Sequence, residues 1–183
     1  MRLPRILNPG LTSYCRLAEY ACIQEGMSLL KVWMIRPARE DDLPQILAME
    51  KISHPRPWSR KDFEAELDGH VSFSYFWVAV SADALSKVAG YICFRWIAGE
   101  VYIINLTVAP GFRRQGVAAR LMDVCIKWAR MHKGKMVVLD VRRDNLPAIA
   151  FYEKAGFMMA CEGRDRSAVS RQDSVVMTLS IGG

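Results

Sequence analysis

The spacing of hydrophobic and polar positions changes along the chain and predicts alternating strands and helices. Runs rich in β-branched and aromatic residues predict strands at 34–38, 73–80, 88–97, 100–108, 135–141, 157–163 and 174–181. Apolar residues at helical spacing predict helices at 39–52, 59–67, 117–132 and 142–156. Hairpins and strand–helix–strand crossovers are mixed in this order. We therefore expect an α/β domain in which helices flank a mixed, largely antiparallel sheet.

The first predicted helix has two distinct faces. Acidic residues stand at its start, where the helix dipole favours negative charge. Leu43, Ile46 and Leu47 mark an apolar face, and Glu50 and Lys51 are assigned to the polar face.

Residues 1–33 differ from the rest of the chain. They hold two early prolines and no sustained periodicity, although 11–26 could form a short helix. We expect a leader of uncertain order, with Met27 and Met34 as plausible true starts, followed by one domain over 34–183.

The composition indicates a globular protein, because 51% of the residues are hydrophobic and 24% are charged. No apolar run reaches the roughly 18–20 residues of a membrane span, so no membrane association is expected. Five dispersed cysteines without a signal peptide indicate reduced thiols in a cytoplasm. The three histidines share no ligand spacing, so we expect no metal.

Positive charge is concentrated in one part of the chain. Residues 101–150 contain nine lysines and arginines and three aspartates, a difference that equals the net charge of +6. A local positive field favours an anionic ligand, although a solvated helix face is the alternative. Aromatic residues do not interleave with this basic segment, so direct nucleic-acid binding is not expected.

The most informative segment joins a predicted strand to a predicted helix. A helix N-terminus carries unpartnered N–H groups and a partial positive charge, and phosphates bind there when the backbone is accessible. Arg113 and Arg114 add charge, while Gly116 and Ala118 remove bulk. The segment matches neither a Walker A loop nor GxGxxG, which disfavours nucleoside triphosphates and dinucleotides.

Arg113-x-x-Gly116-x-Ala118 resembles the acetyl-CoA pyrophosphate loop of the GNAT superfamily of N-acetyltransferases. The segments 105–122 (NLTVAPGFRRQGVAARLM) and 139–157 (LDVRRDNLPAIAFYEKAGF) resemble further parts of that superfamily. RPWS at 56–59 resembles the RimI-type branch, which acetylates the N-terminal alanine of a ribosomal protein. The resemblance covers 34–181 and implies a GNAT-like sheet with a central strand pair splayed by a bulge.

The resemblance implies contacts to acetyl-CoA from two segments and the basic residues between them: Leu106, Thr107, Val108, Arg113, Arg114, Gln115, Gly116, Val117 and Ala118. The N–H near Val108 would polarise the thioester carbonyl. Asn145 would bond the pantetheine arm, although asparagine is also a preferred helix N-cap. Tyr152 matches the general acid that protonates the CoA thiolate, the alternative being a core tyrosine.

Asp140 stands where RimI-type enzymes carry a glutamate, and the resemblance makes it the general base. A carboxylate in the apolar run VVLDV is costly unless it is partnered or functional. The shorter side chain retracts the carboxylate by on the order of 1.5 Å, which favours a bridging water that Tyr102 could hold. Glu100 is the second candidate base. The structural alternative is an ion pair between Asp140 and Arg142.

Pro57, Trp58 and Ser59 lie where the branch holds its acceptor peptide, although Trp58 equally fits a helix-start staple into the core. Ser59 and Asp62 approximate a capping box. The segment 163–171 (GRDRSAVSR) replaces an Asn-Tyr-Tyr segment that lines the acceptor groove in the branch. That departure leaves the acceptor open.

The resemblance implies an acetyl-CoA-dependent N-acetyltransferase. The expected acceptor is the α-amine of a protein or peptide N-terminus, with a ribosomal-protein alanine favoured by the branch, and the amine attacks the thioester directly. One alternative is a transferase for a small amine or a lysine. The other is a weakly catalytic CoA-binding module.

Overall fold

The computed structural model describes residues 33–82, 84–160 and 173–182. Its strands are β1 (Trp33–Pro37), β2 (Ser74–Ser81), β3 (Ala84–Ile97), β4 (Glu100–Val108), β5 (Met136–Arg142), β6 (Met158–Met159) and β7 (Ser174–Ser180). Its α-helices are α2 (Leu43–Ser53), α3 (Arg60–Leu67), α4 (Val117–Met131) and α5 (Leu146–Lys154), and 3₁₀ turns occupy η1 (Glu40–Asp42) and η2 (Pro110–Phe112). The leader at 1–32, with the short helix predicted at 11–26, and the segment 163–171 lie outside the described residues.

Among the described residues, seven strands form one sheet in the order β1-β2-β3-β4-β5-β7-β6. Only β4 and β5 run parallel, and every other neighbouring pair is antiparallel. The predicted mixed, largely antiparallel sheet is therefore confirmed. β1 begins at Trp33, one residue before its predicted start, and the indole Nε1 of Trp33 donates to the carbonyl of Gln115 at 2.8 Å.

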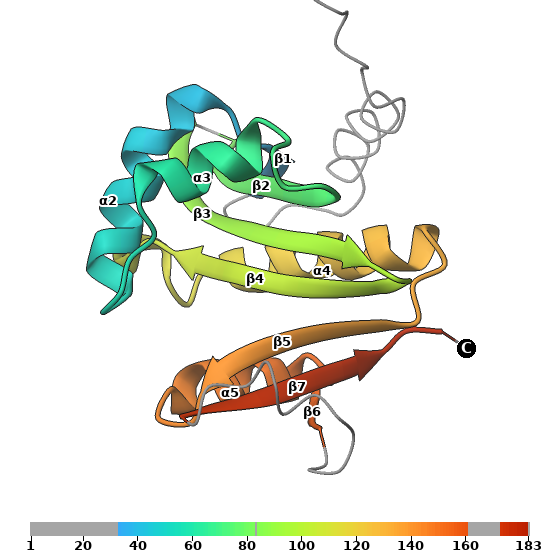
Figure 1. The fold of residues 1–183 in the computed structure, drawn as a ribbon. Coiled ribbons are helices and arrows are strands. Elements are labelled where there is room, and N and C mark those ends of the chain that lie inside the picture. The colour runs from blue at the N-terminus through green and yellow to red at the C-terminus, as the bar shows by residue number, and fades with distance from the viewer. Residues whose placement is uncertain (1–32, 83, 161–172, 183) are drawn as a thin grey trace, which may run out of the picture.

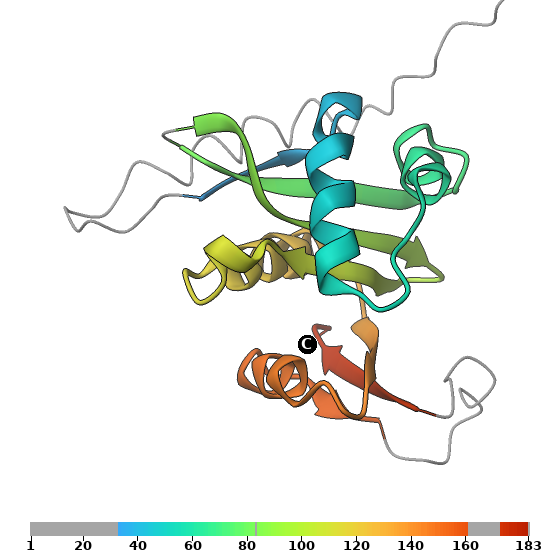
Figure 2. The same cartoon turned by 90° about the vertical axis from the view of Figure 1, so that its left-hand side faces the viewer.

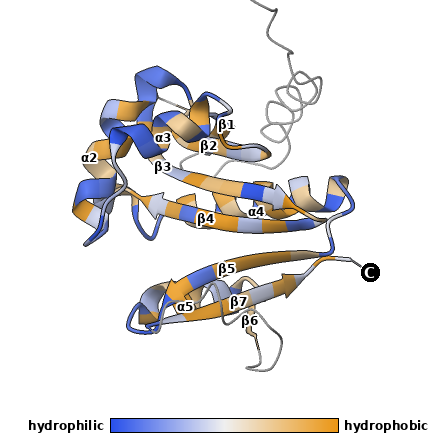
Figure 3. Cartoon of the chain, viewed as in Figure 1, coloured by the Kyte–Doolittle hydropathy of each residue, from blue (hydrophilic) through white to orange (hydrophobic). Residues whose placement is uncertain are grey.

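Helices cover both faces of the sheet and create two apolar clusters (Figures 1 and 2). α2 and α3 pack on one face, which we call the α2 face, and α4 and α5 pack on the other, the α4 face. α3 is largely hydrophilic (Figure 3), and its buried residues are Phe63 and Glu66. The larger cluster lies under α4.

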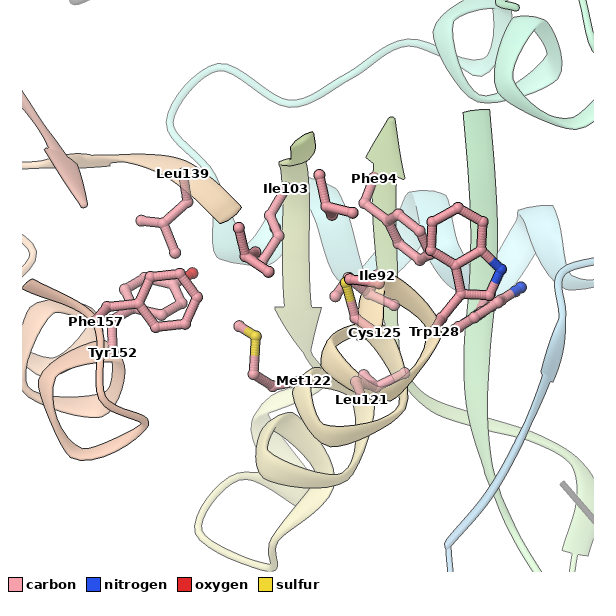
Figure 4. Packing of buried hydrophobic residues seen from close by; sticks show 14 of the residues in the cluster. Ile92, Phe94, Ile103, Leu121, Met122, Cys125, Trp128, Leu139, Tyr152 and Phe157 are labelled. Atoms are coloured by element: carbon pink, nitrogen blue, oxygen red, sulfur yellow. The ribbon is translucent and has the colours of Figure 1, made fainter. Parts of the chain in front are cut away.

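The amphipathic pattern of α4 explains how it covers the sheet. Leu121, Met122, Cys125 and Trp128 recur at helical spacing and are all buried on the side facing β3 and β4, where Trp128 contacts Phe94 (Figure 4). The predicted helical stripe in this segment is confirmed. It anchors the N-terminus of α4 directly behind the end of β4.

A bulge and a divergence distinguish the centre of the sheet. Cys93 pairs with Asn105 and Phe94 with Ile103, so Ile104 is an extra residue in β4. Such a bulge bends its strand. β4 pairs with β5 only from Glu100–Met136 to Ile103–Leu139 in the described ladder, and beyond that point the two strands separate (Figure 1). This is the splayed central pair that the sequence predicted.

Candidate active site

The loop after β4 leads into α4 through residues in left-handed conformations. Gly116 is the N-cap of α4 with φ of +83°, and Arg114 has φ of +61°. Added at Gly116, a Cβ would meet no atom within 4 Å, so the space above this helix start is open. No side chain caps α4, and the first N–H groups of a helix have no intrahelical acceptor. The loop therefore presents backbone donors to an open surface.

The side chains of this loop have differing roles. Arg113 Nε donates to the carbonyl of Val108 at 3.2 Å, and its Nη2 donates to Ser53 at 3.2 Å, so Arg113 ties the loop to β4 and α2. Gln115 Nε2 closes the loop on the carbonyl of Gly111 at 2.9 Å. Arg114 is exposed, Val117 is buried and Ala118 is half-buried.

The end of β4 lies against a glycine of β3. Gly90 pairs with Val108, and a Cβ at Gly90 would approach the carbonyl oxygen of Thr107 to 2.8 Å. Leu106 and Val108 pack toward the α4 cluster, whereas Thr107 is buried at the α2 face with 4% exposure. This strand end is thus held tightly by β3 on one side and left unpaired by β5 on the other.

Tyr152 belongs to the α4 face. It is 9% exposed, packs near Phe151 and Phe157, and carries its hydroxyl on the side toward Ile103 of β4 (Figure 4). Burial raises the pKa of Tyr152 to about 12. The phenol therefore keeps its proton at neutral pH. Asn145 caps α5 by accepting from the Ala148 N–H at 3.3 Å, which confirms the predicted N-cap.

Asp140 lies on the opposite face from Tyr152. Val138 pairs with Tyr102, so Asp140, two residues further along β5, shares the α2 face with Tyr102. Asp140 is exposed although its neighbours in the run VVLDV are buried, and it accepts from Ser174 Oγ at 3.2 Å. The hydroxyl of Tyr102 donates to Glu100 Oε2 at 2.7 Å.

The anticipated ion pair between Asp140 and Arg142 does not form. Arg142 instead pairs with Asp144 through two hydrogen bonds, from Nε at 2.9 Å and from Nη2. The turn after β5 brings Asp144 back to the guanidinium, which local strand parity alone could not reveal.

A surface hollow of about 560 Å³ opens on the α2 face. Its lining comes from the loop after α2, the end of β5 and the start of β7. The lining residues are His54, Pro55, Arg56, Arg142, Arg143, Asp144, Asp173 and Ser174. Ser174 also donates to Asp140, so the hollow adjoins that carboxylate. The hollow therefore lies between the end of β4 and the end of β5, where these two strands diverge.

The predicted acceptor segment lies beside this hollow rather than in its lining. Trp58 packs on Phe63 at a centroid distance of 5.1 Å, which is the staple geometry. Ser59 and Asp62 form the predicted capping box, with the Ser59 N–H donating to Asp62 Oδ2 at 2.7 Å. Pro57 is exposed. The indole is thus engaged in the α2-face core.

A buried polar network at the α2 face was missed at the sequence level. Glu50 is 1% exposed, not on the polar face as expected, and its carboxylate accepts from the Tyr91 hydroxyl. The Trp58 N–H donates to it at 3.0 Å and Asn105 Nδ2 at 3.3 Å. His54 Nε2 lies 3.4 Å away. The spacing held a signal, since Glu50 follows Leu43 by seven residues and falls on the buried helical stripe.

The fold is that of solved acetyltransferase structures. The model of the acetyltransferase (GNAT) family matches residues 43–157, more than half of the chain. The chain belongs to the GNAT family, whose members use acetyl-CoA, and it is an acetyltransferase enzyme.

Two relatives and one solved structure show which acetyltransferases this chain is similar to. The chain is 30% identical over 142 residues to the [ribosomal protein bS18]-alanine N-acetyltransferase of Salmonella typhimurium, covering 76% of this chain and 92% of that protein. It is 27% identical over 136 residues to an N-alpha-acetyltransferase of Saccharolobus solfataricus, covering 67% and 78%. The crystal structure of the ribosomal-protein-S18-alanine N-acetyltransferase from Escherichia coli superposes with a TM-score of 0.69 and 26% identity, over 83% of this chain and 96% of that chain.

Two further observations concern membranes and metals. None of the helices in the described part of the chain combines the length and apolar character needed to cross a bilayer. Within residues 33–82, 84–160 and 173–182, no three histidine, cysteine, aspartate or glutamate side chains gather as metal ligands would.

Proposed function

We propose that this enzyme transfers the acetyl group of acetyl-CoA to the α-amine of a protein N-terminus, and that a ribosomal protein beginning with alanine is its acceptor. The observation that carries the proposal is the divergence of β4 from β5, with Tyr152 on one face and Asp140 on the other. The hollow on the Asp140 side supplies an entrance for the acceptor. Relatives named for this activity support it.

The open start of α4 suits the pyrophosphate of acetyl-CoA. Backbone N–H groups at Gln115, Gly116, Val117 and Ala118 would hold it, with Arg114 exposed beside them. The unpaired edge at 106–108 would hold the pantetheine arm, and Asn145 would add a side-chain contact from α5. The cosubstrate supplies an acetyl group activated as a thioester.

Tyr152 is assigned the role of general acid. Its raised pKa of about 12 keeps the hydroxyl protonated, so it can donate a hydrogen bond to the departing thiolate, and because a thiol has a pKa of about 8.5 the burial makes the phenol a weaker acid than an exposed tyrosine. Burial that excludes water also strengthens such a hydrogen bond. Direct attack is favoured over a cysteine relay because, of the described cysteines, Cys93 and Cys125 are both buried and burial raises the pKa of each thiol.

Asp140 is assigned the role of orienting the acceptor amine and accepting its proton, directly or through a water. The carboxylate is exposed on the α2 face, where an incoming ammonium would meet it. Tyr102 and Glu100 share that face through their own hydrogen bond and stand as the supporting pair. We expect Asp140→Asn to lower kcat while leaving the affinity for CoA unchanged.

Mass spectrometry of peptides incubated with enzyme and acetyl-CoA tests the proposal. The mixture contains peptides that begin with Ala, Ser, Met or Gly, some with an internal lysine, together with small amines. Fragment ions that place the acetyl group on the α-amine of an alanine-starting peptide are the expected result. Acetylation confined to lysine or small amines would refute the acceptor assignment and leave the family unaffected.

A further inference from the structure

The hydrogen bonds around Glu50 fix the direction of a chain of donors. A carboxylate only accepts, so Asn105 must turn its Nδ2 toward Glu50 and its Oδ1 toward Thr107. Thr107 Oγ1 donates to that Oδ1 at 3.0 Å, which uses the single hydrogen of the hydroxyl. Thr107 is therefore left with acceptor capacity toward its next neighbour.

That neighbour is His54, whose Nε2 lies 2.7 Å from Thr107 Oγ1. The Thr107 hydrogen is directed to Asn105, and His54 Nε2 also lies 3.4 Å from the Glu50 carboxylate, which only accepts, so we assign Nε2 as the donor of this bond. In a neutral imidazole one nitrogen carries the hydrogen and the other a lone pair. The network thus places the basic lone pair of His54 on Nδ1, for which no described residue supplies a partner.

The position of His54 relates this lone pair to the proposed reaction. Its side chain is 37% exposed and forms part of the hollow, opposite Arg142 and Ser174. Its partner Thr107 belongs to the β4 segment assigned to the cosubstrate. The imidazole therefore lies on the β4 side of the hollow, while Ser174, the donor to Asp140, lies on its β7 side.

We propose that His54 is a second proton acceptor for the acetyl transfer, which rests on the proposed function. The amine nitrogen bonds to the acetyl carbon as the carbon–sulfur bond breaks, and the proton leaving the nitrogen passes to Nδ1 of His54. The sulfur takes its proton from Tyr152; His54 then releases its proton to solvent and Tyr152 regains one, so the products are the amide and the CoA thiol. The Glu50 carboxylate, 3.4 Å from Nε2, offsets the positive charge that His54 gains, while Tyr91 and Asn105 hold that carboxylate in place.

The charged groups around His54 lie on several elements. Glu50 and Tyr91 face it from within the fold, and Arg113 bonds the neighbouring Ser53. Across and beside the hollow stand Arg56, Arg142, Arg143, Asp144 and Asp173. The groups that surround the imidazole therefore include charges of both signs, from α2, the loop after α2, the turn after β5 and the residue before β7.

If His54 had only a structural role, its imidazole would do no more than link α2 to β4 through the bond to Thr107. The backbone of His54 already caps α2 by donating to the Glu50 carbonyl at 3.0 Å, so the cap does not need the ring. His54→Gln keeps an amide donor for Thr107 and removes the basic nitrogen. His70→Gln is the matched control, because His70 is exposed in the loop before β2.

Steady-state kinetics with an amine that the wild-type enzyme acetylates provide the first readout. We expect His54→Gln to lower kcat by roughly 10- to 100-fold, at the lower end of general-base effects because Asp140 remains. The KM for acetyl-CoA stays unchanged, and His70→Gln behaves as wild type. In His54→Ala, added imidazole restores part of the rate. A kcat for His54→Gln within about twofold of wild type would overturn the proposal.

Nitrogen NMR of wild-type protein with labelled histidines reports the tautomer of His54 without any catalysis. The His54 signals are assigned by their loss in His54→Gln or His54→Ala. The expected spectrum at pH 7–8, near the pH of amine deprotonation, shows His54 as the Nε2–H tautomer. An Nδ1–H tautomer or a fully protonated ring would overturn the assignment of His54 and leave the acetyltransferase unaffected. Failure of the wild-type enzyme to acetylate any N-terminal amine would instead reject the proposed function.

Discussion

Replacing Glu50 by alanine should destabilise the fold far more than removing an exposed glutamate. The carboxylate accepts from the Tyr91 hydroxyl, from the Trp58 N–H at 3.0 Å and from Asn105 at 3.3 and 3.4 Å. Each buried donor left without an acceptor costs about 1–3 kcal/mol, and the long Asn105 contacts belong at the low end. The three donors together give about 3–6 kcal/mol.

Two effects reduce this sum. The alanine variant no longer buries a carboxylate, and the space that it vacates admits water beside the exposed side of His54. We therefore expect Glu50→Ala to lower the free energy of unfolding by about 2–4 kcal/mol, a large part of the usual 5–15 kcal/mol. Glu64→Ala is the control, because Glu64 makes a 2.6 Å ion pair with Arg60 at the surface and should lose at most about 1 kcal/mol.

Urea unfolding at neutral pH measures both variants, with the slope m checked for constancy. Adding Tyr91→Phe to Glu50→Ala removes one orphaned donor, so the double variant should be less destabilised than the two single effects combined. The reasoning fails if Glu50→Ala loses no more than Glu64→Ala, or if Tyr91→Phe and Glu50→Ala are additive.

Three further predictions concern the site and the core. Tyr152→Phe should lower kcat by about 100-fold or more while shifting the free energy of unfolding by less than about 1 kcal/mol, as kinetics and urea unfolding would show. Gly116→Ala should cost about 1–2 kcal/mol because φ is +83°, whereas Gly111→Ala, where φ is not positive, should be neutral in the same unfolding assay. Burial alone raises the pKa of Asp42, but bonds from Arg36 and Arg39 outweigh it and lower the pKa. Its stabilisation is therefore present above about pH 4 and lost as pH falls through the lowered pKa, and Asp42→Asn should flatten the dependence of urea midpoints on acid pH.

Local signals in the sequence predicted the elements that carry the site. The strand, Gly116 turn and amphipathic helix follow one another within a short stretch, and Asn145 caps its helix with neighbouring atoms. Such features depend on backbone conformation and nearest neighbours, which one sequence contains. The mixed, largely antiparallel character of the sheet followed from the same pattern together with the family resemblance.

The features missed depend on residues distant in the chain. Glu50 is buried because Tyr91 and Asn105, 41 and 55 positions away, supply its donors. Asp140 is exposed because the divergence of β5 from β4 leaves its face uncovered, although the run VVLDV indicates a buried strand. The helical spacing could have placed Glu50 on the buried stripe, but the donors that satisfy its carboxylate, and the strand divergence that exposes Asp140, depend on residues far apart in the sequence.

The extra residue in β4 has a consequence for how this protein could change over generations. Without Ile104, Ile103 would still face Phe94 and Asn105 would still face Cys93, so both apolar clusters would keep their members. The bend would disappear, and β4 would be free to continue alongside β5. Deletion of the Ile104 codon is thus expected to give a folded protein without acetyltransferase activity. This position is therefore expected to be more sensitive to deletion than to substitution.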